Sequence, residues 1–147
     1  MRIRDYRPSD LPYLYDICLR TGDSGKDASA LLADPFVIGQ YYAAPYAVRD
    51  GRCVLILEGD RGEAGLSRPL GYILGTDDTA SYNAWLAAEW LPGCASLYGR
   101  ADARRDAGRD AGRGGAQAAA PSLYDRLAGL FTAKPETPAY CDRYPGH

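Results

Sequence analysis

Hydrophobic residues first alternate with charged ones and then recur at helical spacing near the start of the chain. Residues 2–6, "RIRDY", alternate as a short strand does. The next apolar residues return every three or four positions: Leu11, Leu14, Tyr15, Cys18 and Leu19. This spacing predicts a helix with one buried face. Ser9 or Asp10 is suited to cap its start, and Gly22 marks its expected end.

A second helix and a hairpin are expected next. Asp34 is positioned to cap a helix whose first residue is Pro35 and which runs to Pro45. Beyond it, "CVLILEGD" (53–60) and "PLGYILGTDD" (69–78) are continuous apolar runs, as in strands buried on both faces. Because a Gly-rich connection joins them, they predict an antiparallel hairpin.

Helical spacing then returns, with a break in character further along. A helix capped by Thr79 is expected to end before Pro92, with its bulky residues on one side: Tyr82, Trp85, Leu86 and Trp90. Residues 101–120 contain repeated "DARR" and "DAGR" units, and their glycines each disfavour a helix by about 1 kcal/mol. We therefore expect a low-complexity, disordered insertion at 101–120. An amphipathic helix is expected to follow from Leu123 to Phe131.

Charge and cysteine content exclude several functional classes. A net charge of −2 provides no basic field for a phosphate backbone, so nucleic acid is not an expected partner. The N-terminus has no apolar signal segment and no apolar run reaches membrane length, which predicts a cytoplasmic protein without a membrane partner. The four cysteines are far apart, so we expect free thiols and no metal. The single histidine, His147, is the last residue, which argues against a Cys–His or Ser–His–Asp nucleophile.

Four segments carry a resemblance to a known family. "RIRDYRPSDLPYLYDICLRTGDSGKDA", "DPFVIGQYYAAPYAV", "GYILGTDDT" and "AEWLP" together resemble the N-terminal half of GNAT-family N-acetyltransferases, in particular a subgroup similar to the acetyltransferase-like domain of O-GlcNAcase. The resemblance implies an α+β fold, an α/β/α sandwich-like arrangement with β-α-α-β-β-α order and a mainly antiparallel sheet. It also implies that residues 1–147 form a single incomplete domain, truncated before the fourth strand.

The same resemblance implies transfer of an acetyl group from acetyl-CoA to an amine. The acceptor would be a small amine or an amine on a protein. Relatives place carboxylates beside the acceptor, where they hold an ammonium group or accept a proton through water. The candidate substrate-binding residues here are Asp23, Asp27, Tyr46 and Asp77. The alternative is that the aspartates are solvated turn residues and helix caps, and that Tyr46 belongs to the core or its rim.

The cofactor site is the weakest part of the resemblance. Relatives bind the pyrophosphate of acetyl-CoA with a Gly-rich turn after the fourth strand. "RDAGRG" (109–114) matches that turn in letters, but it lacks the flanking strand and helix that would aim the backbone amides, so a chance match is favoured. We therefore expect weak or no acetyl-CoA binding and no activity from this chain alone. A non-catalytic interaction module and an incomplete gene product are the alternative interpretations.

The strand "PLGYILG" is central in relatives, where a fourth strand lies beside it. We expect its edge to be exposed here, together with the sheet face that a helix would cover. The predicted consequences are marginal stability and self-association through this edge, aggregation, or rescue by a complementing fragment.

Overall fold

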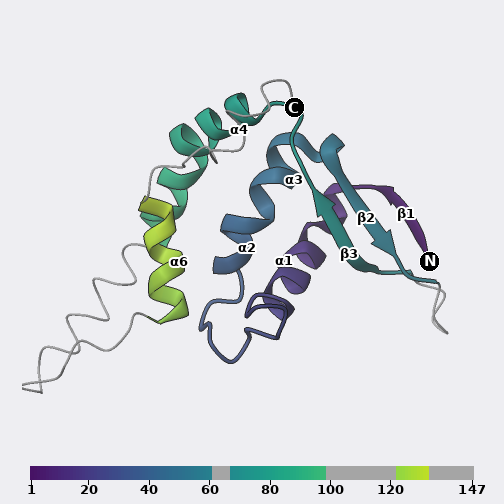
Figure 1. Cartoon of the computed structure of the whole chain (residues 1–147), viewed down its shortest axis with the longest axis horizontal. Helices are drawn as coiled ribbons and strands as arrows, with labels where there is room; N and C mark the ends of the chain where they lie inside the picture. The colour runs from purple at the N-terminus through teal and green to yellow at the C-terminus, as the bar shows by residue number, and fades with distance from the viewer. Residues whose placement is uncertain (61–66, 99–121, 133–147) are drawn as a thin grey trace, which may run out of the picture.

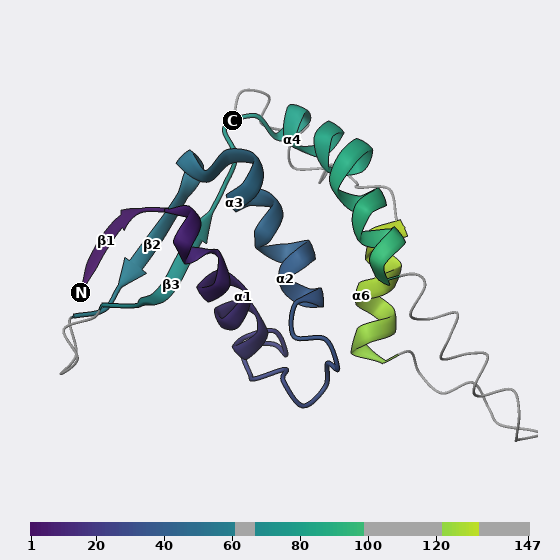
Figure 2. The same ribbon diagram turned by 180° about the vertical axis from the view of Figure 1, so that it is seen from behind.

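The computed structural model describes residues 1–60, 67–98 and 122–132, and arranges them as an antiparallel sheet with its helices on one side. Three layers follow one another across the molecule (Figure 1). The sheet is followed by a middle layer of α1, α2 and α3, and then by an outer layer of α4 and α6. The same arrangement is seen from behind in Figure 2. The described part of the chain is thus an α+β structure.

The sheet contains β1 (Arg2–Asp5), β2 (Val54–Glu58) and β3 (Pro69–Leu74) in the order β1-β2-β3. Both pairs of strands are antiparallel, which confirms the predicted hairpin. Ile3 lies opposite Leu57, and Leu55 lies opposite Ile73. An irregularity at Leu57 and Glu58 shifts the register near the end of the hairpin.

The prediction that these strands are buried on both faces is wrong. Val54 and Ile56 are fully buried, whereas Leu55 between them is 37% exposed and Ile73 on β3 is 64% exposed. Successive side chains of a strand point to opposite faces, and the described helices contact only one of them. A continuous apolar run therefore has one buried face and one exposed face here.

The helices lie in the segments predicted to be helical, but the one helix expected from Pro35 to Pro45 forms two, and the bounds differ. They are α1 (Leu11–Arg20), α2 (Val37–Tyr42), α3 (Ala44–Asp50), α4 (Thr79–Trp85) and α6 (Leu123–Thr132). Two 3₁₀ turns, η1 (Pro8–Asp10) and η2 (Gly51–Cys53), precede α1 and β2. A π-helical segment, η3 (Leu86–Trp90), continues α4, and residues 91–98 are again α-helical.

Proline explains two corrections to these bounds. The helix expected from Pro35 to Pro45 begins at Val37 and breaks at Ala43, and Pro45 lies in the first turn of α3, where its missing N–H is tolerated. The helix expected to end before Pro92 continues past it. The π turn of η3 is wider than an α turn, and it precedes Pro92. The ring of Pro92 would crowd a regular α turn at this place.

The expected helix caps are also revised. Asp10 does not cap α1 with its side chain; its carboxylate accepts hydrogen bonds from the backbone N–H of Arg7 and from Arg4. The cap of α4 is Asp78 rather than Thr79, since Asp78 Oδ1 accepts a hydrogen bond of 2.9 Å from the N–H of Ser81. Asp34 accepts from the N–H of Phe36, ahead of α2.

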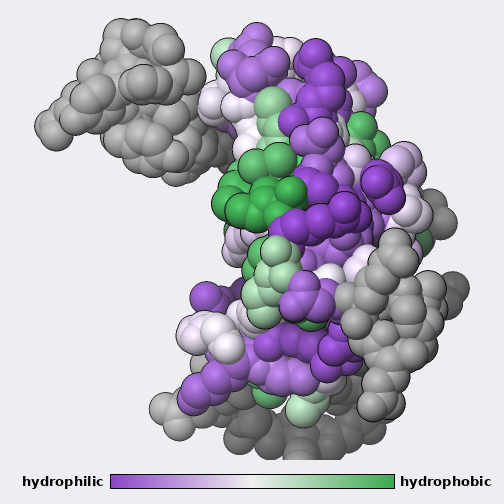
Figure 3. All heavy atoms as spheres, turned by 90° about the vertical axis from the view of Figure 1, so that its right-hand side faces the viewer, coloured by the Kyte–Doolittle hydropathy of each residue, from purple (hydrophilic) through white to green (hydrophobic). Residues whose placement is uncertain are grey.

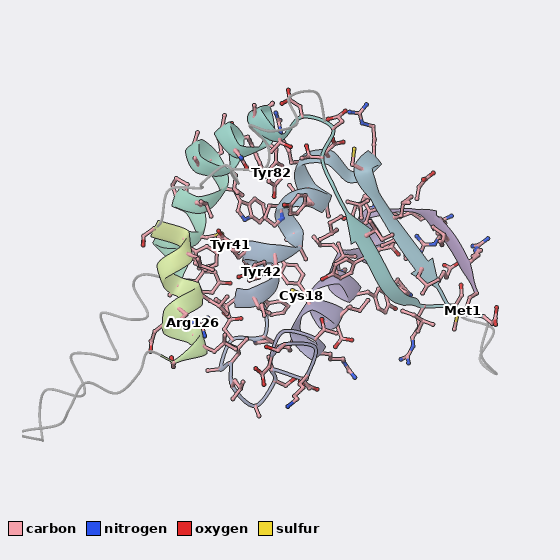
Figure 4. The ribbon with its side chains drawn as sticks, viewed as in Figure 1. Met1, Cys18, Tyr41, Tyr42, Tyr82 and Arg126 are labelled. Atoms are coloured by element: carbon pink, nitrogen blue, oxygen red, sulfur yellow. The ribbon has the colours of Figure 1, made fainter. Side chains whose placement is uncertain are left out.

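Aromatic rings fill the space between the middle and outer layers. Tyr41 of α2 and Tyr82 of α4 lie there (Figure 4). Phe131 of α6 stacks on Tyr98 at 5.1 Å and meets Tyr41 edge-on at 6.0 Å. The predicted helix at Leu123 to Phe131 is therefore confirmed, and its buried residues are Tyr124, Leu127, Ala128 and Phe131.

Some expectations concern residues outside the described part of the chain. These are the insertion at 101–120, the "RDAGRG" segment at 109–114, and Cys141 and His147. Within the described residues, no helix has both the length and the apolar character needed to cross a membrane.

Candidate functional site

A pocket of about 280 Å³ lies where the end of α3, the η2 turn, the loop after β3 and the start of α4 meet. Its walls are almost entirely polar. It is lined by Arg49, Asp50, Arg52, Thr76, Asp77, Asp78, Ser81 and Tyr82. Three carboxylates therefore face two guanidinium groups, and the pocket has an excess of negative charge.

The pocket already contains a cation, which is supplied by the chain itself. Arg52 Nε lies 3.4 Å from Asp50 Oδ1, and Arg52 Nη2 lies 3.7 Å from Asp77 Oδ2. The Arg52 side chain is 85% exposed, so little packing holds it in this position. Exposed ion pairs of this kind are weak, about 0–1 kcal/mol. The ion pairs that place Arg52 between the two carboxylates are therefore weak.

Cys53 adds a thiol to this cluster. Its Sγ donates to Asp50 Oδ2 at 3.4 Å. This hydrogen bond is the main cause that lowers the pKa of Asp50 and raises the pKa of Cys53. One ligand atom each from Asp50, Cys53 and Asp77 lie within 4.8 Å of one another, a grouping able to hold a metal ion. In this structure the partners of these carboxylates are Arg52 and the thiol.

Tyr82 contributes one aromatic ring to the lining, and further aromatic side chains pack behind it. Tyr46 of α3 stacks on Tyr82 of α4, with ring centroids 4.5 Å apart. Burial, followed by the neighbouring Tyr46, raises the pKa of Tyr82. Arg49 lies 5.6 Å from the centroid of the Trp85 ring, and its Nη2 reaches Ser81 Oγ at 3.4 Å. Arg49 is therefore held against the wall, in contrast to Arg52.

The four predicted site residues are divided between two ends of the molecule. Asp77 lines the pocket, and Tyr46 lies one ring behind it. Asp23 and Asp27 belong to the loop that follows α1, which lies at the opposite end of the middle layer from the start of α4 (Figures 1 and 2). The pocket lining includes neither of them.

Asp23 and Asp27 have structural partners in that loop. The backbone N–H and C=O of Asp23 bond to those of Lys26 across a tight turn, in which Ser24 and Gly25 both have positive φ. Asp27 accepts hydrogen bonds from the hydroxyl and the backbone N–H of Ser29, which lower its pKa. These contacts stabilise the loop.

Sequence reasoning missed most of the pocket. Asp50 and Arg52 lie 25 or more positions before Asp77 and Asp78 in the chain, and no motif links the two segments. Cys53 looked like the first residue of a strand. Only their positions at one end of the β2–β3 hairpin could have suggested that they meet, because antiparallel pairing places Val54 opposite Leu74.

The pocket does not fit the pyrophosphate of acetyl-CoA. A pyrophosphate needs backbone amides or cations without competing acids. The loop that leads into α4 instead presents Asp77 and Asp78. No other pyrophosphate-binding turn is evident in residues 1–60, 67–98 and 122–132. The groups assembled at this pocket suit a positively charged ligand.

Comparison with known proteins places the fold. No family model matches this chain. The crystal structure of SsHAT is similar to it, with a TM-score of 0.64 and 29% sequence identity over 89% of this chain. SsHAT is an acetyltransferase by name. The fold is acetyltransferase-like. The chain spans 55% of the length of SsHAT.

Proposed function

We propose that this chain takes part in N-acetyl transfer as the acceptor-binding part of a GNAT-type enzyme, with acetyl-CoA as the acetyl donor and an amine as the acceptor. The similarity to SsHAT supports the reaction class. The polar pocket supports the acceptor role, because it presents carboxylates to a cation. Among acceptors, we propose an amine of the lysine side-chain type, because the letters HAT in the name of SsHAT are those used for histone acetyltransferases.

The observation that carries this proposal is the position of Arg52. Its guanidinium lies between Asp50 and Asp77, at the place where an ammonium group would bind. An incoming ammonium group would replace the exposed guanidinium of Arg52. Binding would therefore leave neither carboxylate without a cationic partner. The ring of Tyr82, which stacks on Tyr46 behind it, would lie beside the alkyl chain of the acceptor.

The carboxylates are suited to binding the acceptor rather than to deprotonating it. Hydrogen bonding with Cys53 lowers the pKa of Asp50, which makes it a weaker base. Asp77 is 66% exposed on its side chain, so water can reach an amine bound beside it. The described residues therefore orient an amine, and its deprotonation proceeds through solvent at the mouth of the pocket.

The test is binding of Nα-acetyl-lysine methylamide to the full chain, followed by NMR titration. Asp77→Asn should weaken binding by about fivefold to tenfold, because one charge-assisted contact is lost. Arg52→Gln should strengthen binding, because it removes the competing cation. Asp27→Asn is the matched control, since it neutralises a carboxylate at the other end of the molecule and should leave binding unchanged.

A ligand control separates charge recognition from nonspecific contact. The same compound acetylated on its side-chain nitrogen has no positive charge and should not bind the pocket. Equal binding of the charged and uncharged compounds would contradict the proposal, as would equal weakening by Asp77→Asn and Asp27→Asn.

The second candidate is a non-catalytic interaction module with the same fold. The observation that favours it is the acidic loop before α4, which is unsuited to the donor's pyrophosphate. We propose that acetyl-CoA binds this chain weakly. Acetyl transfer to the lysine derivative by the chain alone would rule out the module, and amine binding without transfer would fit either candidate.

A further inference from the structure

We propose that Arg49 and Ser81 bind a carboxylate of the acceptor, so that the acceptor is a small zwitterionic molecule with an amine at one end and a carboxylate at the other. This inference rests on the proposed function, because it adds a second contact to a ligand whose ammonium group would lie between Asp50 and Asp77. Both sets of residues line the same pocket of about 280 Å³, so one small molecule can reach both.

The two guanidinium groups of the pocket have different kinds of partner. Arg52 is paired with two carboxylates. Arg49 contacts a hydroxyl and an aromatic ring instead, with its Nη2 3.4 Å from Ser81 Oγ and its Cζ 5.6 Å from the centroid of the Trp85 ring. In the described part of the chain, no ion pair joins Arg49 to a carboxylate. Arg49 therefore brings to the pocket a positive charge that no carboxylate of these residues contacts directly.

The guanidinium of Arg49 is also held in a defined position. Arg49 lies in the last turn of α3, and its two partners, Ser81 and Trp85, are four residues apart on one face of α4. The contact with the tryptophan ring uses the face of a guanidinium, so N–H donors on its edge stay available to a planar carboxylate. The hydroxyl of Ser81 can donate to the same carboxylate. This side of the pocket therefore presents two kinds of donor to an anionic group.

The anion-binding side and the cation-binding side of the pocket are separate. Arg49 and Asp50 are consecutive residues of α3, so their side chains leave the helix in different directions. The Arg49 side chain contacts α4. The Asp50 side chain contacts Cys53 and Arg52 of η2 instead. The end of the molecule that carries the pocket, at the top of Figure 3, is mainly hydrophilic, as suits a small ligand with opposite charges at its two ends.

The test compares Nα-acetyl-lysine, which has a free carboxylate, with its methylamide by NMR titration of the full chain. The unmodified chain should bind the carboxylate compound at least about fivefold more tightly, because it gains a charge-assisted contact. Arg49→Gln should abolish this preference without weakening the binding of the methylamide, because the substitution removes only a charge that repels the amine. Arg49→Lys should keep part of the preference, because it keeps the charge but not the planar arrangement of donors.

Arg20→Gln is the matched control. Arg20 pairs with Asp16 at the end of α1, away from the pocket, and its substitution should leave the preference unchanged. Equal affinity of the unmodified chain for the two compounds would overturn the carboxylate contact and leave the amine site standing. Equal weakening of both compounds by Arg49→Gln would show that Arg49 only supports the fold, and would also overturn the proposal. Failure of both compounds to bind would contradict the proposed function together with this inference.

Discussion

At the scale of single residues, the clearest organising feature is a chain of ion pairs at the edge of the sheet. Arg4 Nε donates to Glu58 Oε1 at 2.9 Å, and its two terminal nitrogens donate to the carboxylate of Asp10 at 2.7 and 2.8 Å. Arg2 donates to the other oxygen of Glu58 at 2.6 Å. Glu58 and Asp10 are both buried, and they are stable there because each carboxylate has several donors.

These ion pairs predict how stability depends on pH. Hydrogen bonds from Arg2 and then Arg4 lower the pKa of Glu58 from 4.5 to about 2. A lowered carboxylate pKa gives stability that is complete above pH 4.5 and is lost as pH falls towards 2. Glu58→Gln should therefore be less stable at neutral pH and should lose less stability over this acid range. Urea unfolding at several pH values measures both effects.

The matched control for this prediction is Asp16→Asn. Asp16 also pairs with an arginine, Arg20, but both side chains are more than half exposed. Its substitution should change the pH dependence little. Identical acid profiles for the unmodified chain and Glu58→Gln would show that Glu58 does not carry the effect.

At the scale of elements, the contact between α1 and α2 depends on a glycine. A Cβ at Gly39 of α2 would overlap the ring of Tyr15 on α1, and that ring also meets Phe36 edge-on at 5.4 Å. The two helices approach closely only because position 39 has no side chain. The hydrophobic pattern located both helices, but it gave no information about this approach.

Gly39→Ala should destabilise the fold by about 1–3 kcal/mol, because overpacking forces α1 and α2 apart. Gly129→Ala in α6 is the matched control. A Cβ there would meet nothing within 4 Å, so the better helix propensity of alanine should stabilise the chain by up to about 1 kcal/mol. Chemical denaturation of both variants measures the difference. Stabilisation by Gly39→Ala would contradict the close packing of these helices.

At the scale of the whole molecule, the helices of the described residues all lie on one side of the sheet. Ile56 is fully buried beneath the middle layer, while Ile3 on the opposite face is 66% exposed. Both residues belong to apolar positions of neighbouring strands, so sequence alone does not distinguish them. Their different environments are a property of the layered arrangement.

This asymmetry can be tested by the same substitution on each face. Ile56→Thr should lower the free energy of unfolding by at least about 2 kcal/mol, because it buries a hydroxyl and removes packed carbon atoms. Ile3→Thr should change it by less than about 0.5 kcal/mol. A loss at Ile3 as large as that at Ile56 would mean that the outer face is covered in solution.

Local patterns in the sequence were enough to predict most elements. The spacing of Leu14 and Cys18 predicted α1 and its buried face, and the apolar runs at β2 and β3 predicted the hairpin. Backbone hydrogen bonding within one helix or one hairpin is a local event, so neighbouring residues largely decide it. The bounds were less well predicted, because Ala43 and Pro92 lie where packing and proline geometry compete.

The sequence by itself therefore determined the type of most of the described elements, and it named Asp77 and Tyr46 as candidates. Only the tertiary structure decided which strand face is buried, and that Arg52 of one segment lies between Asp50 and Asp77. It also separated Asp23 and Asp27 from the pocket, although their residue type and loop context match those of Asp77. The physical reason is that charge clusters and buried faces arise from the pairing of distant segments, whereas helix and strand patterns are recorded locally in the chain.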